Sequence, residues 1–229
     1  MAKKGKKTRK ELLKEPDEFM TLTGKVVKFA ADHKTKLTYG LGIILALAIV
    51  ISAVRFISIR ADNKASAMLE KSMLEYGSMQ APKKPDEVFN AVSGSFQTIL
   101  KKYGGKPSGK LARLIYANIC YDAGKYKQAI DLYNTSLKDF AKHPMIHSQV
   151  LSSLGYANEQ QKEYTTAINY FEKISAAPEQ NLRDEALFHL GRLYNKIGQP
   201  EKSKAAYQKI VNDHPDFIYI DLVKENISG

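Results

Sequence analysis

The sequence has few of the features from which active sites are usually built. Its 229 residues contain no Gly-rich phosphate loop, no Gly-x-Ser-x-Gly motif and no Cys/His cluster at metal-ligand spacing. A single cysteine, Cys120, excludes a disulfide framework. It stands in an apolar helical run without an evident neighbouring base, so we interpret it as a small buried hydrophobic residue rather than a nucleophile.

One pair of histidines has the spacing of metal ligands. His143 and His147 are four residues apart, and two histidines at that spacing on one helix can share a metal ion. Pro144, however, places His143 before the helix start, and no carboxylate motif accompanies the pair. We therefore expect no metal, no cofactor and no small-molecule substrate, and we expect that the chain is not an enzyme.

The positive charge is unevenly distributed. Of the formal net charge of +11, much lies in residues 1–36, which hold eleven Lys/Arg against five Asp/Glu. Residues 60–229 hold twenty-three Lys/Arg against nineteen Asp/Glu, a net charge of +4. A basic run can contact nucleic acid. Here an apolar segment follows the run, so membrane topology explains it and we expect no nucleic-acid partner.

The longest apolar segment has the length of a membrane span. Residues 37–54 carry no charge, and residues 37–59, which include Arg55, form about 34 Å of helix at 1.5 Å per residue. This exceeds a hydrocarbon core of about 30 Å. The run is longer than the apolar core of a signal peptide, and no small-x-small cleavage site follows it. The segment is therefore predicted to be a retained signal anchor.

The basic residues around the span predict its orientation. Lys and Arg concentrate before it, which keeps residues 1–36 in the cytoplasm as a basic tail and sends residues 60–229 across the membrane. Within the tail, a helix is expected to start near Pro16. Phe19, Leu22, Val26 and Phe29 then share one face, which suits either the inner membrane surface or a partner helix.

Residues 110–216 contain an internal repeat. Small residues recur at spacings of 38 and 36, and twelve positions later a second set of small residues keeps the same spacings. Four positions further on, an aromatic residue stands in each copy. The columns are Ala117, Gly155 and Gly191; Ala129, Ala167 and Ser203; and Tyr133, Phe171 and Tyr207. We interpret each copy as a helical hairpin, in which the small residues permit close approach and the aromatic residue fills the space between hairpins.

Turn residues agree with this interpretation. Gly124 and Gly198 fall between the paired helices, and Pro144, Pro178 and Pro215 fall between one hairpin and the next. Stacked hairpins share a continuous core, so the prediction is an all-α solenoid that follows a single N-terminal transmembrane helix.

Period, small positions, aromatic residues and terminal prolines resemble the tetratricopeptide repeat, whose usual length is 34 residues. This resemblance divides residues 60–229 into repeats at 110–144, 147–180 and 183–216, a degenerate copy at about 61–108, and a terminal cap. The chain departs from the pattern at Cys120, where the motif prefers Tyr, and at Pro200 and Ser203, where it prefers Tyr and Ala.

The resemblance implies a concave groove lined by the first helix of each repeat. Mixed aromatic and amide side chains there suit an extended peptide or a helix of a partner. The predicted groove residues are Leu114, Asn118, Tyr121, Gln149, Ser152, Tyr156, Phe188, Arg192 and Asn195. A clamp for a C-terminal carboxylate is not expected, because Leu114 stands where such clamps carry Lys.

As a whole, the architecture resembles the ancillary SecYEG translocon subunit family (YfgM-like). That resemblance implies a single-pass protein of the bacterial inner membrane, with a cytoplasmic N-terminus and a periplasmic repeat domain. It implies translocon subunits, exported chains or periplasmic chaperones as partners. One alternative is an envelope-complex or cytochrome assembly factor that uses the same groove, and another is an enzyme whose repeats only position a partner.

Overall fold

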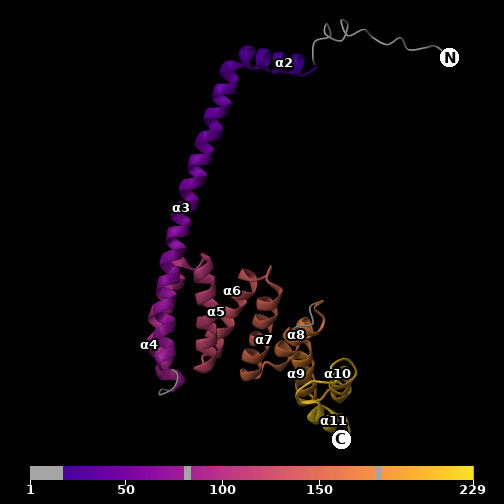
Figure 1. The fold of residues 1–229 in the computed structure, drawn as a ribbon. Helices are drawn as coiled ribbons and strands as arrows, with labels where there is room; N and C mark the ends of the chain where they lie inside the picture. Colours follow the sequence, from indigo (N-terminus) through magenta and orange to yellow (C-terminus); the bar gives the residue numbers. More distant parts are fainter. Residues whose placement is uncertain (1–17, 80–83, 179–181, 229) are drawn as a thin grey trace, which may run out of the picture. The chain divides into compact units, whose positions relative to one another are not determined.

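The computed structural model describes residues 18–79, 84–178 and 182–228, and the regular structure of these residues is entirely helical (Figure 1). The predicted all-α fold is therefore confirmed for the described part of the chain. The basic run at residues 3–10 and the helix start expected at Pro16 lie outside the described residues. The chain divides into two compact units, Met1–Ile57 and Ser58–Gly229.

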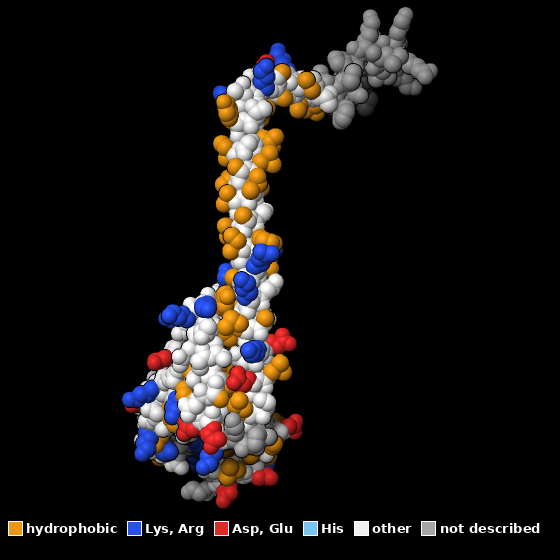
Figure 2. All heavy atoms as spheres, turned by 90° about the vertical axis from the view of Figure 1, so that its left-hand side faces the viewer, with side chains coloured by type: hydrophobic (Ala, Val, Ile, Leu, Met, Phe, Trp, Pro, Cys, Tyr) orange, Lys and Arg blue, Asp and Glu red, His pale blue; other side chains and the backbone are white. Residues whose placement is uncertain are grey.

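The first unit holds α2 (Glu18–Asp32) and the first part of α3 (Lys34–Met79). In α2, Leu22, Val26 and Phe29 are all more than half exposed, so the apolar face of this helix has no cover within the described residues. Among those residues, α3 is the helix whose length and apolar composition suffice to cross a membrane. Figure 2 shows hydrophobic side chains along its apolar stretch.

The second unit is a succession of antiparallel helices built from the predicted repeats. The end of α3 packs with α4 (Pro85–Tyr103), because Leu69 shares a core cluster with Val92 and Phe96. Three hairpins and a final helix follow. They are α5 (Pro107–Asp122) with α6 (Tyr126–Asp139), α7 (Pro144–Gln160) with α8 (Tyr164–Ser175), α9 (Arg183–Lys196) with α10 (Pro200–Asp213), and α11 (Ile220–Ser228).

The three hairpins turn in the same way. Gly124, Lys162 and Gly198 each adopt a positive φ, of 69°, 63° and 73°. The next residue in each turn donates its backbone N–H to the carbonyl five residues earlier, as in Lys125 to Cys120 at 2.8 Å. This hydrogen bond satisfies a carbonyl at the end of the first helix. The turn position keeps the spacings of 38 and 36, although the middle copy uses Lys instead of Gly.

Prolines also mark helix starts, which shifts two expected boundaries. Pro107, Pro144 and Pro200 occupy the first turn of α5, α7 and α10. The hairpins therefore begin at 107 and 144 rather than at 110 and 147. Proline lacks an N–H, but the first helical N–H groups have no partner within the helix, so this position tolerates it at little cost. Pro178 follows α8 and Pro215 follows α10, and both lie in the links between elements.

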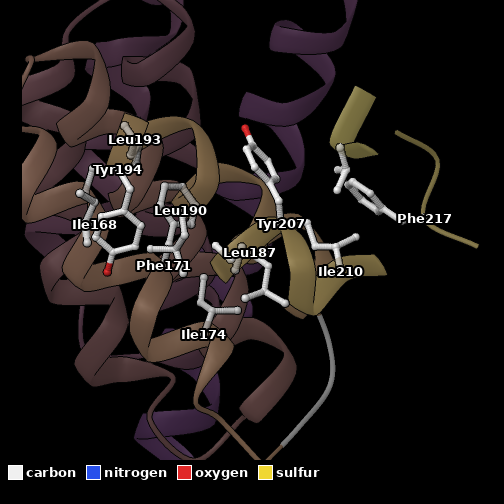
Figure 3. Close-up of a cluster of buried hydrophobic side chains, with 14 of the residues drawn as sticks. Ile168, Phe171, Ile174, Leu187, Leu190, Leu193, Tyr194, Tyr207, Ile210 and Phe217 are labelled. Atoms are coloured by element: carbon white, nitrogen blue, oxygen red, sulfur yellow. The ribbon is translucent and has the colours of Figure 1, made fainter. Parts of the chain in front are cut away.

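All nine residues of the repeat columns are buried. Gly155 leaves room for the ring of Phe171, since a Cβ on Gly155 would lie 2.6 Å from Cζ of Phe171. Phe171 in turn belongs to a cluster that extends through α8, α9 and α10 to Phe217 (Figure 3). A second cluster joins α3 to α7, with Phe96 stacked on Tyr116 at a centroid distance of 5.5 Å. The core is thus continuous from one hairpin to the next, as stacked repeats require.

Candidate partner-binding groove

Side chains connect the first helices of successive hairpins. The hydroxyl of Tyr156 on α7 donates to the carboxylate of Glu185 on α9. The same hydroxyl lies 3.0 Å from Nε2 of His189. Because a phenol carries one proton, we assign the proton of His189 to Nε2, which donates to the hydroxyl oxygen of Tyr156. The buried Nδ1 then faces the interior as an acceptor and has no partner among the described residues.

This network is neutral at its centre. Burial, followed by the nearby charge of Arg192, lowers the pKa of His189 to about 4. Burial, followed by the bond to Glu185, raises the pKa of Tyr156. At neutral pH the imidazole and the phenol are therefore both uncharged. Tyr156 holds α7 and α9 together and is a poor candidate for a free contact with a partner.

An ion pair adds a second connection between the same helices. Arg192 on α9 pairs with Glu159 on α7, and the side chain of Arg192 is 46% exposed whereas that of Glu159 is 13% exposed. Such a pair contributes about 0–1 kcal/mol. It orients the guanidinium along the α7 side of α9.

On the other side of α7, Tyr121 of α5 hydrogen-bonds to Gln160, and burial raises the pKa of Tyr121.

The nine predicted groove residues fall into three groups. Four are exposed, namely Asn118, Gln149, Arg192 and Asn195. Four are half-buried, namely Leu114, Tyr121, Tyr156 and Phe188. Asn118 is exposed, but its Oδ1 accepts a hydrogen bond from the hydroxyl of Tyr133, with 2.7 Å between the two oxygen atoms. Its amide group is therefore only partly available to a partner.

The structure corrects the prediction that Ser152 is a groove residue. Its side chain is 2% exposed, so it cannot contact a partner from the groove. α7 is packed by α6 and α8 and is connected to α9 by the network around Tyr156. A helix covered in this way keeps only a narrow outer stripe, and Gln149 stands on that stripe whereas Ser152 does not.

The structure adds a pocket that the sequence interpretation missed. It has a volume of about 640 Å³ and lies between α9 and the link from α10 to α11. Three predicted groove residues line it, namely Tyr156, Phe188 and Arg192. The new lining residues include Asp184 and the link residues 216–219. The signal in the sequence was the apolar run Phe-Ile-Tyr-Ile at residues 217–220, which was predicted only to belong to a terminal cap.

Phe188 is the centre of the aromatic residues around this pocket. Its ring lies 5.7 Å from Phe217 and 5.5 Å from Tyr219, measured between centroids, and 6.1 Å from Tyr207. Phe217 and Tyr219 are also in edge contact at 5.6 Å. Because both belong to the link, these contacts hold residues 216–219 against α9.

Two sequence features are candidate reactive sites, the pair of histidines and the lone cysteine. Within residues 18–79, 84–178 and 182–228, no group of three or more His, Cys, Asp or Glu side chains has the geometry of a metal site. His143 precedes α7, and His147 stands within its first turn. Burial raises the pKa of Cys120 to about 12, so its thiol stays protonated.

Comparison with known proteins identifies the repeats. Family models described as tetratricopeptide repeat match residues 94–144 and residues 185–216. The chain therefore contains tetratricopeptide repeats, which imply a protein–protein interaction scaffold. No curated protein matches the chain significantly.

Matches to two solved structures each cover more than half of the chain. The structure titled BtubC (BKLC), from P. vanneervenii, is 12% identical with a TM-score of 0.50, and the match covers 74% of this chain and 81% of that one. MamA is 25% identical with a TM-score of 0.47, and its match covers 62% of this chain and 80% of that one. The match to BtubC shows only that the two proteins have a similar fold.

Proposed function

We propose that the chain is a membrane-anchored interaction scaffold, ancillary to the Sec translocon, that passes emerging chains to periplasmic chaperones. In this proposal it crosses the bacterial inner membrane once, with residues 1–36 in the cytoplasm, residues 37–59 in the bilayer and residues 60–229 in the periplasm. Its partners are translocon subunits, exported chains or periplasmic chaperones. They bind along the first helices α5, α7 and α9.

One observation carries the proposal most directly. The same helix, α3, contains an apolar stretch of membrane-spanning length and, further along, the buried residues Ala65 and Leu69 of the repeat unit. Within α3 the apolar stretch and the first residues of the repeat unit follow one another along the chain without a segment of irregular structure between them, which supports a repeat domain that begins directly after the anchor.

The groove residues that remain accessible support contacts with protein. Asn118, Gln149 and Asn195 can each donate and accept hydrogen bonds with a peptide backbone. Leu114, Tyr121 and Phe188 provide partly exposed apolar area between them. Such a mixture of amide and apolar side chains suits an extended segment better than a small molecule.

Photo-crosslinking in membranes of the native cell tests this function. A crosslinking residue at Gln149 or Asn195 uses exposed positions of α7 and α9, and it leaves the Tyr156 network intact. We expect capture of channel subunits, exported chains or chaperones. Asn169, an exposed position on the second helix α8, is the matched control.

Three outcomes would contradict the proposal. Equal capture at Asn169 and at the groove positions would mean that the first helices have no special role. Capture of a single envelope-maturation complex would favour the assembly-factor alternative. Recovery of the chain in the cytosol would remove the membrane anchor on which both functions depend.

A further inference from the structure

The pocket between α9 and the α10–α11 link presents uncovered apolar surface. Ile218 is 80% exposed, Tyr219 is 53% exposed and Leu222 is 44% exposed, and all three line the pocket together with Phe188. Figure 3 shows Phe217, which anchors the link, at the edge of the cluster that holds Tyr207 and Ile210. Large apolar side chains that cluster around a cavity usually mark a binding site.

Carboxylates stand beside this apolar surface. Asp184, Glu185 and Asp216 line the same pocket. Asp184 and Phe188 are four residues apart on α9, so they share one face of the helix. Among the described residues, Asp216 forms no ion pair, and Asp184 accepts only the backbone N–H of Glu185 at 2.9 Å. With respect to the part of the chain that the structure describes, both carboxylates therefore keep acceptor positions without a partner.

The balance of charge in the pocket is negative. Among the described residues that line it, Arg192 is the only Lys or Arg, and its guanidinium is paired with Glu159 outside the pocket. The N-terminus of α9 adds a partial charge of about +0.5, which offsets half of one carboxylate. The neutral imidazole of His189 adds none. The surrounding unit, residues 60–229, has a net charge of +4, so this pocket has the opposite sign.

We propose that the pocket binds an extended segment of a partner protein in which an aromatic or branched aliphatic residue is followed by Lys or Arg. The apolar side chain contacts Phe188, Tyr219 and Leu222, and the cation meets Asp184 and Asp216. The exposed ring of Tyr219 provides a further contact for the cation. This inference rests on the proposed function, because it specifies the chemistry of the partner that the groove receives.

Peptide binding to the full chain in neutral-lipid nanodiscs tests the proposal. The first labelled peptide alternates Phe or Leu with Lys. A second peptide replaces each Lys by Glu, and a third replaces each Phe and Leu by Ser. Fluorescence anisotropy should give the tightest binding for the first peptide. Added salt should weaken this binding, because the ion pairs form at an open surface.

Two variants locate the site. Asp184→Asn combined with Asp216→Asn should weaken binding of the first peptide roughly three- to tenfold, as expected for two partly exposed ion pairs. Asp213→Asn combined with Asp221→Asn is the control, since it removes the same charge from exposed residues nearby that do not line the pocket. Ile218→Ser tests the apolar contact, and at 80% exposure this side chain contributes little to folding.

The outcomes separate this inference from the function on which it rests. Equal binding of the Lys and Glu peptides, or equal weakening by the two double variants, would overturn the pocket assignment. Self-association that Ile218→Ser abolishes would also overturn it, since a second copy would then cover the pocket. If crosslinking at Gln149 still captures export partners, the scaffold function stands. If it captures none, both fail.

Discussion

Gly191 lies directly against Tyr207. A Cβ on Gly191 would stand 2.4 Å from Cε1 of the tyrosine ring, closer than side-chain carbon atoms ever approach. Tyr207 is 2% exposed and is held in the core, so its ring has no free space into which it can move. The glycine in the middle of α9 thus fixes the distance at which α10 packs.

We expect Gly191→Ala to destabilise the repeat unit. Alanine gains about 1 kcal/mol of helix propensity, but overpacking against a buried ring costs roughly 1–3 kcal/mol. The expected net loss in the free energy of unfolding is about 0–2 kcal/mol. Chemical denaturation of the full chain in mild detergent, followed by far-UV circular dichroism, measures it. Gly94→Ala is the control, because nothing lies within 4 Å of that Cβ, and it should stabilise.

Lys162→Gly should be neutral to stabilising. Lys162 occupies the turn position with φ 63°, where the other two hairpins have glycine. A left-handed conformation costs a non-glycine residue roughly 1–2 kcal/mol, and the greater flexibility of unfolded glycine offsets roughly 0.5–1 kcal/mol. Denaturation should therefore show a gain in the free energy of unfolding of about 0–1.5 kcal/mol. The reverse change, Gly124→Lys, should destabilise, and equal effects of the two variants would contradict the explanation.

The contributions of Arg113 and Asp139 to the free energy of unfolding should be coupled. The guanidinium of Arg113 donates to Asp139 and to the carbonyl of Gly104 at 2.9 Å, and both charged side chains are mostly buried. Arg113→Met should cost roughly 1–3 kcal/mol, less than a fully buried pair because Lys110 remains 3.2 Å from Asp139. A double-mutant cycle with Asp139→Asn measures the coupling. Strictly additive effects would mean that the pair contributes nothing.

His189 should make stability depend on pH. Its pKa is lowered from 6.5 to about 4 in the folded state, so above pH 6.5 the imidazole is neutral in both states. As the pH falls from 6.5 towards 4, only the unfolded state binds the proton, and stability falls. The loss between pH 7 and pH 4.5 should be roughly 2 kcal/mol. In His189→Gln this part of the pH dependence should disappear, and an unchanged pH profile would contradict the assignment.

Single-cysteine labelling tests the topology that we propose. Cys120 is buried, so Cys120→Ala gives a chain without thiols to which one cysteine can be added. A cysteine at Asn195 should react with an impermeant maleimide in spheroplasts. A cysteine at Lys25 should react only after the membrane is permeabilised. The opposite pattern would invert the orientation, and reaction of both in intact spheroplasts would exclude a single span.

Several features of the fold could be predicted from local patterns. Residue size recurs at fixed spacing in the columns of Gly155 and Gly191, because each repeat meets its neighbour through the same contact. Glycine at Gly124 and Gly198 marks turns for a similar reason, since positive φ favours that residue. The middle turn at Lys162 carries no such signal. Its conformation is imposed by the two helices that it joins.

The groove was harder to predict than the repeats. The position of Ser152 within its repeat suggested an accessible side chain, but α7 is covered by its neighbours and leaves Ser152 buried. Tyr156 has the position of a groove residue, yet its hydroxyl is engaged with Glu185 and His189, which lie 29 and 33 residues away. Helical periodicity indicates which residues share one face of a helix. It does not indicate which other helix covers that face.

By itself, the sequence determined the all-α class, the hairpin repeat and the apolar segment, because each depends on residue types at short, regular spacing. Only the tertiary structure decided which first-helix residues remain accessible. It also decided that residues 216–219 fold against Phe188 and close a pocket with Asp184. Contacts of this kind join residues about thirty positions apart, and they depend on how completed helices pack, which no local pattern encodes.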